Sequence, residues 1–150
     1  MIVYEGPGDL LHTDIPTITC PVNIVGAMGA GLALAMRKRI PGLYPYYQQL
    51  CRDRTLRIGR CAVYPIPNRQ QQVLLLPTKA HWRDPSELHY VEQALEFMLE
   101  HQATLNIEEL ALPPLGCGLG QLDYPRDVGP LIKRLLGSVE DLNVHILFGP

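Results

Sequence analysis

Hydrophobic positions along the chain fall into short apolar runs that alternate with longer, helix-spaced segments. The short runs predict strands over 2–4, 17–23, 61–64, 73–76, 109–112 and 144–148. Helical spacing predicts helices over 28–39, 43–52, 86–102 and 122–136, and Ser86 has the side chain of an N-cap. Gly6 to Asp9 reads as a turn. Because strands and helices alternate after residue 17, we predict an α/β fold with a mixed, largely parallel central sheet.

Length and composition are those of one globular domain, residues 1–150, which is compatible with the N-terminal part of a longer protein. The chain is 47% hydrophobic and 19% charged. No apolar run reaches the roughly 18 residues that span a bilayer, and the N-terminus lacks the pattern of a signal peptide. We therefore expect a cytoplasmic protein with no membrane partner. The cysteines have no CxxC spacing, so we expect small buried thiols and no metal site.

Charge is unevenly distributed although the net charge is only -2. Eight Lys or Arg residues and one acid, Asp53, lie between residues 37 and 69, whereas eleven acids lie from Asp84 onward. A basic half can attract phosphate groups. Ordinary solvated charges on helices and loops explain the same pattern, and the sequence leaves both interpretations open.

The first candidate binding segment is a loop between a predicted strand and a predicted helix. It follows Asn23 and carries glycines at positions 26, 29 and 31. Glycine lets the backbone approach an anion closely, and the first amides of a helix have no intrahelical acceptor. The loop has neither the Walker pattern nor GxGxxG. Taken alone, it fits a phosphate site and a plain strand-to-helix turn equally well.

A second glycine-rich loop, Gly116-Cys117-Gly118-Leu119-Gly120, also follows a predicted strand and precedes a helix. Ligands of open α/β sheets bind outside the carboxyl ends of the strands, so the two loops are expected to face each other. Two opposed loops suit a diphosphate better than a single phosphate. The pair therefore favours a diphosphate ligand over two unrelated turns.

The third segment, Thr78-Lys79-Ala80-His81-Trp82-Arg83, follows a fully apolar run. An amine beside a buried strand is partly desolvated, which favours its neutral, nucleophilic form. Trp82 offers an aromatic surface on which a base can stack. The alternatives, a lysine that extends to solvent and a tryptophan in local packing, stay open at this point.

The order of these motifs resembles that of macrodomains over essentially the whole chain. The motifs are Gly8-Asp9-Leu10, Val22-Asn23, the loop from Gly26 to Gly31, and Gly116-Cys117-Gly118-Leu119. Met28-Gly29-Ala30-Gly31 and Thr78-Lys79 resemble the branch that holds the human terminal ADP-ribose protein glycohydrolase and, more closely, the DarG-type antitoxin macrodomains. The resemblance implies a three-layer α/β/α macrodomain fold.

The resemblance also implies which positions bind ADP-ribose. Asp9, next to Leu10, would accept a hydrogen bond from the adenine amino group, Phe148 would pack on the adenine, and Asn23 would contact the distal ribose. Backbone amides would hold the two phosphates; the positions are Met28, Gly29, Ala30, Gly31 and Leu32 in the first loop and Gly116, Cys117, Gly118, Leu119 and Gly120 in the second.

Lys79 is the catalytic residue that the resemblance implies. It would attack the anomeric carbon of the distal ribose and release ADP-ribose from a modified macromolecule, which for the antitoxin branch is a thymine base in single-stranded DNA. The human enzyme has an aspartate where this chain has Gly120, so proton transfer would fall to water, a substrate phosphate or His81. Asp123 is expected to cap a helix.

The expected partners are ADP-ribose, which is ligand and product, ADP-ribosylated single-stranded DNA and a cognate DNA ADP-ribosyltransferase toxin. His81, Trp82 and Arg83 are expected to contact the nucleic acid, and no cofactor or metal is expected. Three alternatives stay open: a non-catalytic ADP-ribose reader, a hydrolase of protein-glutamate ADP-ribose esters or O-acetyl-ADP-ribose, and an interaction module that binds no nucleotide.

Overall fold

The computed structural model describes residues 1–149, and its centre is one six-stranded mixed sheet. The strands are β1 (Ile2–Pro7), β2 (Thr17–Asn23), β3 (Ala62–Pro65), β4 (Gln72–Lys79), β5 (Glu109–Leu112) and β6 (Asn143–Phe148). Their order is β1-β6-β5-β2-β4-β3. Every neighbouring pair is parallel except β3 with β4, so β3 is an antiparallel edge strand.

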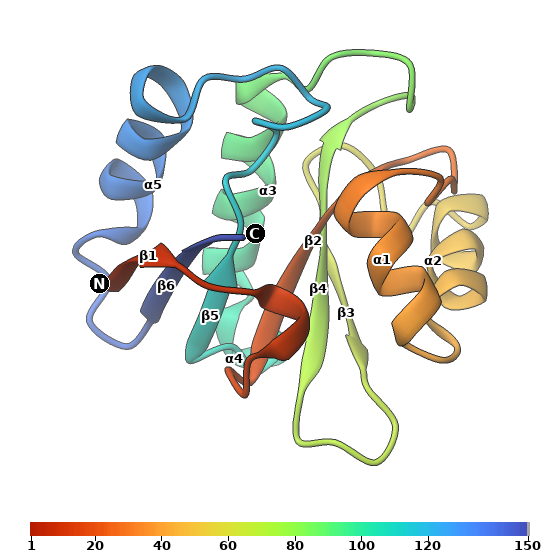
Figure 1. Cartoon of the computed structure of the whole chain (residues 1–150), viewed down its shortest axis with the longest axis horizontal. Coiled ribbons are helices and arrows are strands. Elements are labelled where there is room, and N and C mark those ends of the chain that lie inside the picture. The colour runs from red at the N-terminus through yellow and green to blue at the C-terminus, as the bar shows by residue number, and fades with distance from the viewer. Residues whose placement is uncertain (150) are drawn as a thin grey trace.

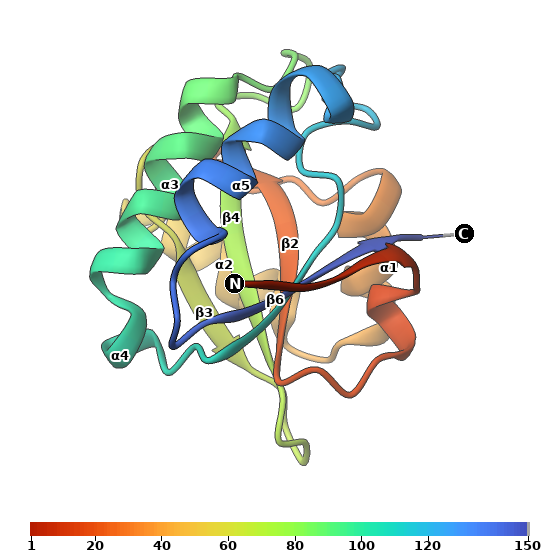
Figure 2. The same cartoon turned by 90° about the vertical axis from the view of Figure 1, so that its left-hand side faces the viewer.

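Helices cover both faces of the sheet, which gives the predicted three layers (Figure 2). They are α1 (Gly31–Arg39), α2 (Leu43–Arg52), α3 (Leu88–Glu100), α4 (Gln102–Leu105) and α5 (Gly129–Leu136), with a short 3-10 turn η1 (Leu10–His12) and a π turn η2 (Tyr124–Val128). One core cluster joins α3 and α5 to the sheet. The other joins α1 and α2 to the opposite face.

The central residues of β4 are all apolar and do not alternate with polar residues, because both faces of the strand are buried. Leu74 and Leu76 belong to the core under α3 and α5, whereas Val73 and Leu75 belong to the core under α1 and α2. All four side chains are fully buried. A parallel strand covered by helices on both faces has no polar side, and this places the end of β4 deep in the molecule.

Two predicted boundaries near the N-terminus differ from the structure. Gly6 and Pro7 lie in β1 and not in a turn, because they pair with Leu147 and Phe148 of β6. Proline is tolerated there since β1 is an edge strand. Residues 28–30 are not helical: α1 begins at Gly31, and Ala30 has extended dihedrals.

Two predicted helices also differ from the structure. Ser86 does not cap α3, which begins at Leu88 after Glu87, and its hydroxyl bonds to Thr78 instead. The helix predicted over 86–102 ends at Glu100, and the short α4 follows. The segment predicted as one helix over 122–136 is the π turn η2 followed by α5. Asp123 caps η2 as expected, since its carboxylate accepts from the Arg126 amide at 2.8 Å.

Five parallel strands end at the same edge of the sheet, and the loops after β2, β4 and β5 gather at the top of Figure 1. All the segments singled out in the sequence follow these strand ends. No helix in the described part of the chain is long and apolar enough to cross a membrane. The expectation of buried thiols is confirmed for Cys20 and Cys61, whereas Cys51 and Cys117 are only partly buried.

Candidate functional site

A cleft of about 760 Å³ opens at the carboxyl ends of the strands. Its walls come from the loops after β2, β4 and β5. The lining residues that the sequence had singled out are Asn23, Gly29, Ala30, Gly31, Leu32, Lys79, Trp82, Arg83, Gly116, Gly118, Leu119 and Gly120. The structure therefore brings the two glycine loops and the lysine segment to one site.

Asn23 organises the first glycine loop. Its Oδ1 accepts from the amides of Val25 at 3.1 Å and Ala27 at 3.3 Å, and its Nδ2 donates to the Ala27 carbonyl at 2.9 Å. The buried hydroxyl of Tyr47 lies 2.8 Å from the same Oδ1. Because the side chain is committed to the loop, only its second amide hydrogen is free for a ligand. Asn23 is thus mainly a loop-forming residue that also faces the cleft.

The first loop presents unpaired amides to the cleft at the start of α1. The first backbone bond of the helix runs from the Leu34 amide to the Ala30 carbonyl at 3.2 Å. The preceding amides, those of Gly31, Leu32 and Ala33, have no intrahelical acceptor, and all three residues line the cleft. The positive end of the helix dipole adds to their attraction for an anion.

The second loop is a closed turn with free amides at its tip. Gly116 has φ 70°, and its carbonyl accepts from the Leu122 amide at 2.8 Å, while Gly118 accepts from Gln121 at 3.2 Å. Within residues 1–149 the amides of Gly118 and Gly120 donate to no protein acceptor. Cys117 departs from the expectation, since its amide already donates to the Pro114 carbonyl.

The two loops touch across the cleft. A Cβ atom placed on Gly31 would lie 3.3 Å from Leu119 Cδ1. Gly31 also has φ 57°, a left-handed conformation that favours glycine. Leu119 is two-thirds exposed, so it extends from one loop toward the other over the cleft. This arrangement of amide-rich backbones on two sides is what a pyrophosphate requires.

Lys79 is the last residue of β4 and lies beside the first loop. It pairs with Asn23 in the register of β2 and β4. The side chain is partly buried and lines the cleft. Within the described residues the side-chain amine of Lys79 has no hydrogen bond and no ion pair, so it is free to act on a ligand.

The segment after Lys79 forms a tight turn that holds Trp82 over the cleft. The Asp84 amide donates to the His81 carbonyl at 3.0 Å, and the Arg83 amide donates to His81 Nδ1 at 3.1 Å. Trp82 is 55% exposed, and the Arg83 guanidinium lies 5.0 Å from its ring centroid. Trp82, Arg83 and Asp84 line the cleft, whereas His81 does not. His81 instead supports the turn.

The residues expected at the adenine end, Asp9 and Phe148, do not line the cleft. The Asp9 carboxylate accepts a hydrogen bond from the Leu11 amide at 2.9 Å and contacts His12 Nδ1 at 2.7 Å. The contact with His12, followed by the weaker effect of the Leu11 amide, lowers the pKa of Asp9. The Phe148 ring meets the Tyr124 ring edge-on, with the ring centroids 5.1 Å apart. The Gly8 amide donates to the Phe148 carbonyl, which brings Phe148 close to Asp9.

Three side chains that were expected near the ligand are mainly structural. Leu10 and Met28 are buried in the core under α1 and α2. Cys117 packs against the other core, and burial, followed by the charges of Asp123 and Asp127, raises the pKa of its thiol to about 11. A neutral thiol is a poor nucleophile, so Cys117 is not a second catalytic candidate.

Sequence reasoning missed three polar side chains that line the cleft: Thr78, Asp84 and Ser86. Thr78 and Ser86 are almost completely buried, with exposures of 2% and 5%. A buried hydroxyl next to a cleft is informative, but the sequence shows neither burial nor the contact between these two residues. Asp84 is the only carboxylate among the lining residues, and its place two residues after Trp82 was a usable signal.

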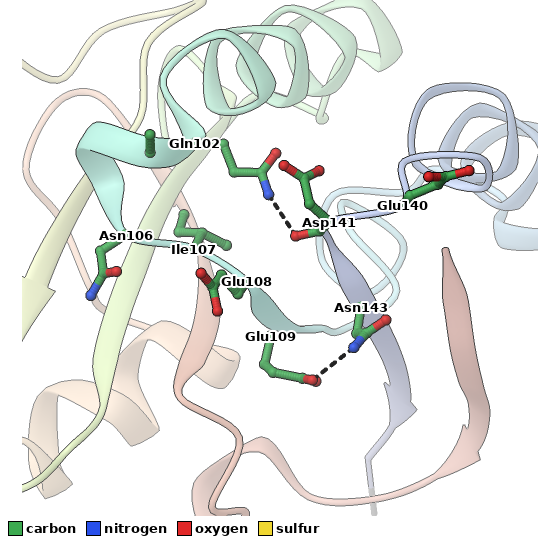
Figure 3. Close-up of a pocket in the computed structure, with 9 residues that line it drawn as sticks. Gln102, Asn106, Ile107, Glu108, Glu109, Glu140, Asp141 and Asn143 are labelled. Atoms are coloured by element: carbon green, nitrogen blue, oxygen red, sulfur yellow. Dashed lines mark hydrogen bonds between the residues drawn. The ribbon is translucent and has the colours of Figure 1, made fainter.

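A second cavity of about 560 Å³ lies at the opposite end of the sheet, where β5 and β6 begin (Figure 3). Its lining includes four acids, Glu108, Glu109, Glu140 and Asp141. Asn143 Nδ2 donates to Glu109 Oε1 at 2.9 Å, and Gln102 Nε2 donates to the Asp141 carbonyl at 3.0 Å (Figure 3). Nothing in this lining is basic, so an anionic ligand is disfavoured there.

The basic stretch of residues 37–69 makes mostly local contacts. The Arg37 guanidinium lies 3.9 Å from the Tyr44 ring centroid, and Arg39 lies 2.8 Å from His12 Nε2. None of these basic residues lines the cleft. No group of three His, Cys, Asp or Glu side chains within residues 1–149 could hold a metal ion.

Comparison with solved structures gives closely similar folds. The macrodomain of Mycobacterium tuberculosis DarG is 34% identical with a TM-score of 0.89, over 100% of this chain and 97% of that one. Thermosipho africanus DarTG in complex with ADP-ribose is 36% identical with a TM-score of 0.85, over 95% of this chain and 40% of that one. The first similarity includes the whole sheet and the cleft loops, because it covers all of this chain.

Comparison with curated proteins finds a Thermosipho africanus protein named as a DNA ADP-ribosyl transferase–DNA ADP-ribosyl glycohydrolase fusion. It is 35% identical over 150 residues, which cover 89% of this chain and 38% of that protein. The chain spans about two fifths of the length of the curated relatives it matches. The family model for the Macro domain matches residues 20–128. With these motifs, this sheet and this cleft, the chain belongs to the macrodomain family.

Proposed function

We propose that the domain is a glycohydrolase that removes ADP-ribose from modified single-stranded DNA, with Lys79 as the nucleophile. The observation that carries the proposal is an unpaired lysine amine in the same cleft as two opposed glycine loops. A domain that only bound ADP-ribose would need the loops but no free amine beside them. The DNA substrate is supported by the glycohydrolase name of the fusion relative.

The free amides of the two loops hold the pyrophosphate in this proposal. Gly31, Leu32 and Ala33 approach it from the start of α1, and Gly118 and Gly120 approach it from the second loop. Such donors are fixed before the ligand arrives, so binding costs little reorganisation. The distal ribose then lies between the ends of β2 and β4, next to Lys79.

The reaction begins when the neutral amine of Lys79 attacks the anomeric carbon of the distal ribose. A carbon–nitrogen bond forms to Lys79 Nζ while the bond from that carbon to the thymine nitrogen breaks. The bonding electron pair leaves with the base, which then takes up a proton. The product is a glycosylamine, whose sugar ring opens when the bond between the anomeric carbon and the ring oxygen breaks, which gives an imine. Water hydrolyses this imine, and this step releases ADP-ribose and restores the amine.

Asp84 is the residue that we assign to proton transfer. The position that carries an aspartate in the human enzyme is Gly120 here, and a Cβ atom at that position would lie 2.5 Å from the Gly116 carbonyl. The second loop therefore has no room for an acid. Asp84 is the only carboxylate lining the cleft and lies on the same turn as Trp82. It can take a proton from the amine and return one to the leaving base.

Trp82 and Arg83 are the groups that we assign to the nucleic acid. Trp82 is largely exposed at the cleft rim, and an exposed tryptophan is a surface on which a base stacks. Arg83 adds a cation that pairs with backbone phosphates. His81 acts indirectly, since its ring accepts a bond from the Arg83 amide and sets the turn.

The enzyme class that supplies the substrate is a DNA ADP-ribosyltransferase, which we propose as the functional partner. In the Thermosipho africanus relative, the printed name joins a transferase and a glycohydrolase in one polypeptide. A domain that reverses the modification then acts as an antitoxin to the enzyme that makes it.

The test is release of ADP-ribose from an ADP-ribosylated single-stranded oligonucleotide by wild type and by Lys79→Met. Met keeps the length of the side chain and removes the amine. We expect a loss of at least about 1000-fold in kcat, because the covalent step disappears, while the Kd for ADP-ribose changes less than about threefold. Full activity in Lys79→Met would refute the mechanism.

A parallel assay separates the enzyme from its alternatives. The same wild-type protein is incubated with glutamate-linked ADP-ribosylated protein and with O-acetyl-ADP-ribose. Faster turnover of these esters than of the modified DNA would mean that an ADP-ribose ester, and not modified DNA, is the substrate. Binding of ADP-ribose without turnover of any of these substrates would mean that the domain is a non-catalytic ADP-ribose reader.

A further inference from the structure

Ser86 lies two residues before the start of α3 and is almost completely buried. It is 5% exposed, and its hydroxyl donates to Thr78 Oγ1 at 3.2 Å instead of capping α3. Burying a hydroxyl costs free energy unless it is hydrogen bonded, so this contact is a preferred geometry and not an incidental one. The bond connects a residue two positions before α3 to the residue directly before Lys79.

The same residue is the support around which the second glycine loop closes. The Ser86 amide donates to the Gly120 carbonyl at 2.8 Å. A Cβ atom on Gly120 would lie 2.2 Å from Ser86 Oγ, and one on Gly116 would lie 3.0 Å from Ser86 Cβ. Both glycines are therefore needed because the Ser86 side chain fills the space between them.

A third bond completes the connection, since the Glu87 amide donates to the Thr78 carbonyl at 3.0 Å. The end of β4 and the second loop have no direct hydrogen bond within residues 1–149; both are bonded to residues 86–87. The end of β4 that carries Lys79 is thus joined to the second loop through residues 86–87.

We propose that Ser86 is a positioning residue, whose hydroxyl fixes the end of β4, and with it Lys79, against the Gly116–Gly120 loop. The inference rests on the proposed function of Lys79 as nucleophile. It assigns to Ser86 no contact with the substrate. Loss of the hydroxyl loosens Lys79 while the backbone bond to Gly120 keeps the loop, and therefore the pyrophosphate site, in place.

The test compares Ser86→Ala with wild type in kcat and in the Kd for ADP-ribose. A misplacement of about 1 Å costs up to about 100-fold in rate, so we expect kcat to fall by about 10- to 100-fold and Kd to change less than about threefold. The only other serine of the chain, the exposed Ser138, gives the matched control Ser138→Ala, which should keep wild-type kcat.

Variants of Thr78 test the bond from its other side. Thr78→Val keeps the shape of the side chain and removes the acceptor, so it should lose as much kcat as Ser86→Ala. Thr78→Ser keeps a hydroxyl and should recover most of that loss. The double variant Ser86→Ala/Thr78→Val should be no slower than either single variant, because both remove one shared interaction. Additive losses, or no recovery in Thr78→Ser, would overturn the proposal.

Amide hydrogen exchange without substrate gives a readout that does not need activity. Ser86→Ala should speed exchange at Lys79 and Ala80 and leave the Gly118 and Gly120 amides as in wild type. If wild type does not cleave modified DNA, the proposed function fails, and this exchange pattern still decides the positioning role. Unchanged exchange at Lys79 would refute it. If Ser86→Ala does not fold, the Thr78→Val and Thr78→Ser pair decides by the same measurements.

Discussion

The two ends of the sheet carry cavities of similar size and opposite chemistry. The cleft at the carboxyl ends, about 760 Å³, is lined by glycines, free amides, Lys79 and a single acid, Asp84. The cavity where β5 and β6 begin, about 560 Å³, has four acids and no base. Volume alone would accommodate a nucleotide at either end. We therefore expect an anion at the carboxyl ends of the strands, because the donors and charges there follow from strand direction and helix starts.

Of the changes that compare the two ends of the sheet, removal of one acid at each end has the largest expected effect on kcat. Asp84→Asn keeps the shape of the cleft and should lower kcat on modified DNA by about 100-fold or more, the usual effect of losing a general acid–base group. Glu108→Gln, in the acidic cavity, is the matched control and should keep wild-type kcat. Single-turnover kinetics over a range of pH measures both. Equal rates in the two variants would remove Asp84 from the mechanism.

The next largest effect concerns the amide-rich backbone. Gly120→Ala would place a Cβ atom 2.2 Å from Ser86 Oγ and 2.5 Å from the Gly116 carbonyl, so the loop must shift. Overpacking of this kind costs about 1–3 kcal/mol, and if the whole cost falls on the ligand-bound loop the Kd for ADP-ribose rises roughly 5- to 150-fold. Titration calorimetry measures the change. An unchanged Kd would show that the second loop does not hold the pyrophosphate.

The sequence predicted the elements of the cleft better than its internal bonds. The strand Thr17–Asn23, the helix Leu43–Arg52 and both glycine loops could be predicted because they depend on local apolar runs and on residues with special backbone freedom. The role of Ser86 could not, since its helix-cap signal is local while its actual partner is Thr78 on another element. Asp84 was overlooked because its one local signal, its place two residues after Trp82, does not show that the carboxylate lines the cleft.

A smaller effect distinguishes the cleft rim from the distant basic residues. Arg83→Gln should weaken binding of modified single-stranded DNA, and the slope of log K against log salt should fall by about 0.7 for one lost phosphate contact. Arg69→Gln is the control, since Arg69 lies 3.4 Å from Gln71 Oε1 in the loop before β4 and does not line the cleft. Fluorescence anisotropy at several salt concentrations gives both slopes. If the slope changes only in Arg69→Gln, the DNA backbone contacts the basic stretch of residues 37–69 and not Arg83.

The smallest effect belongs to the acidic cavity, whose polar contacts serve stability. Hydrogen bonds from Asn143 and His145 lower the pKa of Glu109 below its usual range. Folding therefore favours the ionised form of Glu109. The resulting gain in folding stability is present above the pKa of the unfolded state and is lost as the pH falls through the pKa of the folded state. Since Glu109 is about two-fifths exposed, the gain is that of a screened pair, about 1 kcal/mol or less. Thermal unfolding should show Glu109→Gln less stable than wild type at pH 7, and the difference should shrink as the pH falls below the usual glutamate pKa, while the Kd for ADP-ribose at pH 7 stays unchanged. A weakened Kd would mean that the two ends of the sheet are coupled, because no residue lining the acidic cavity also lines the cleft.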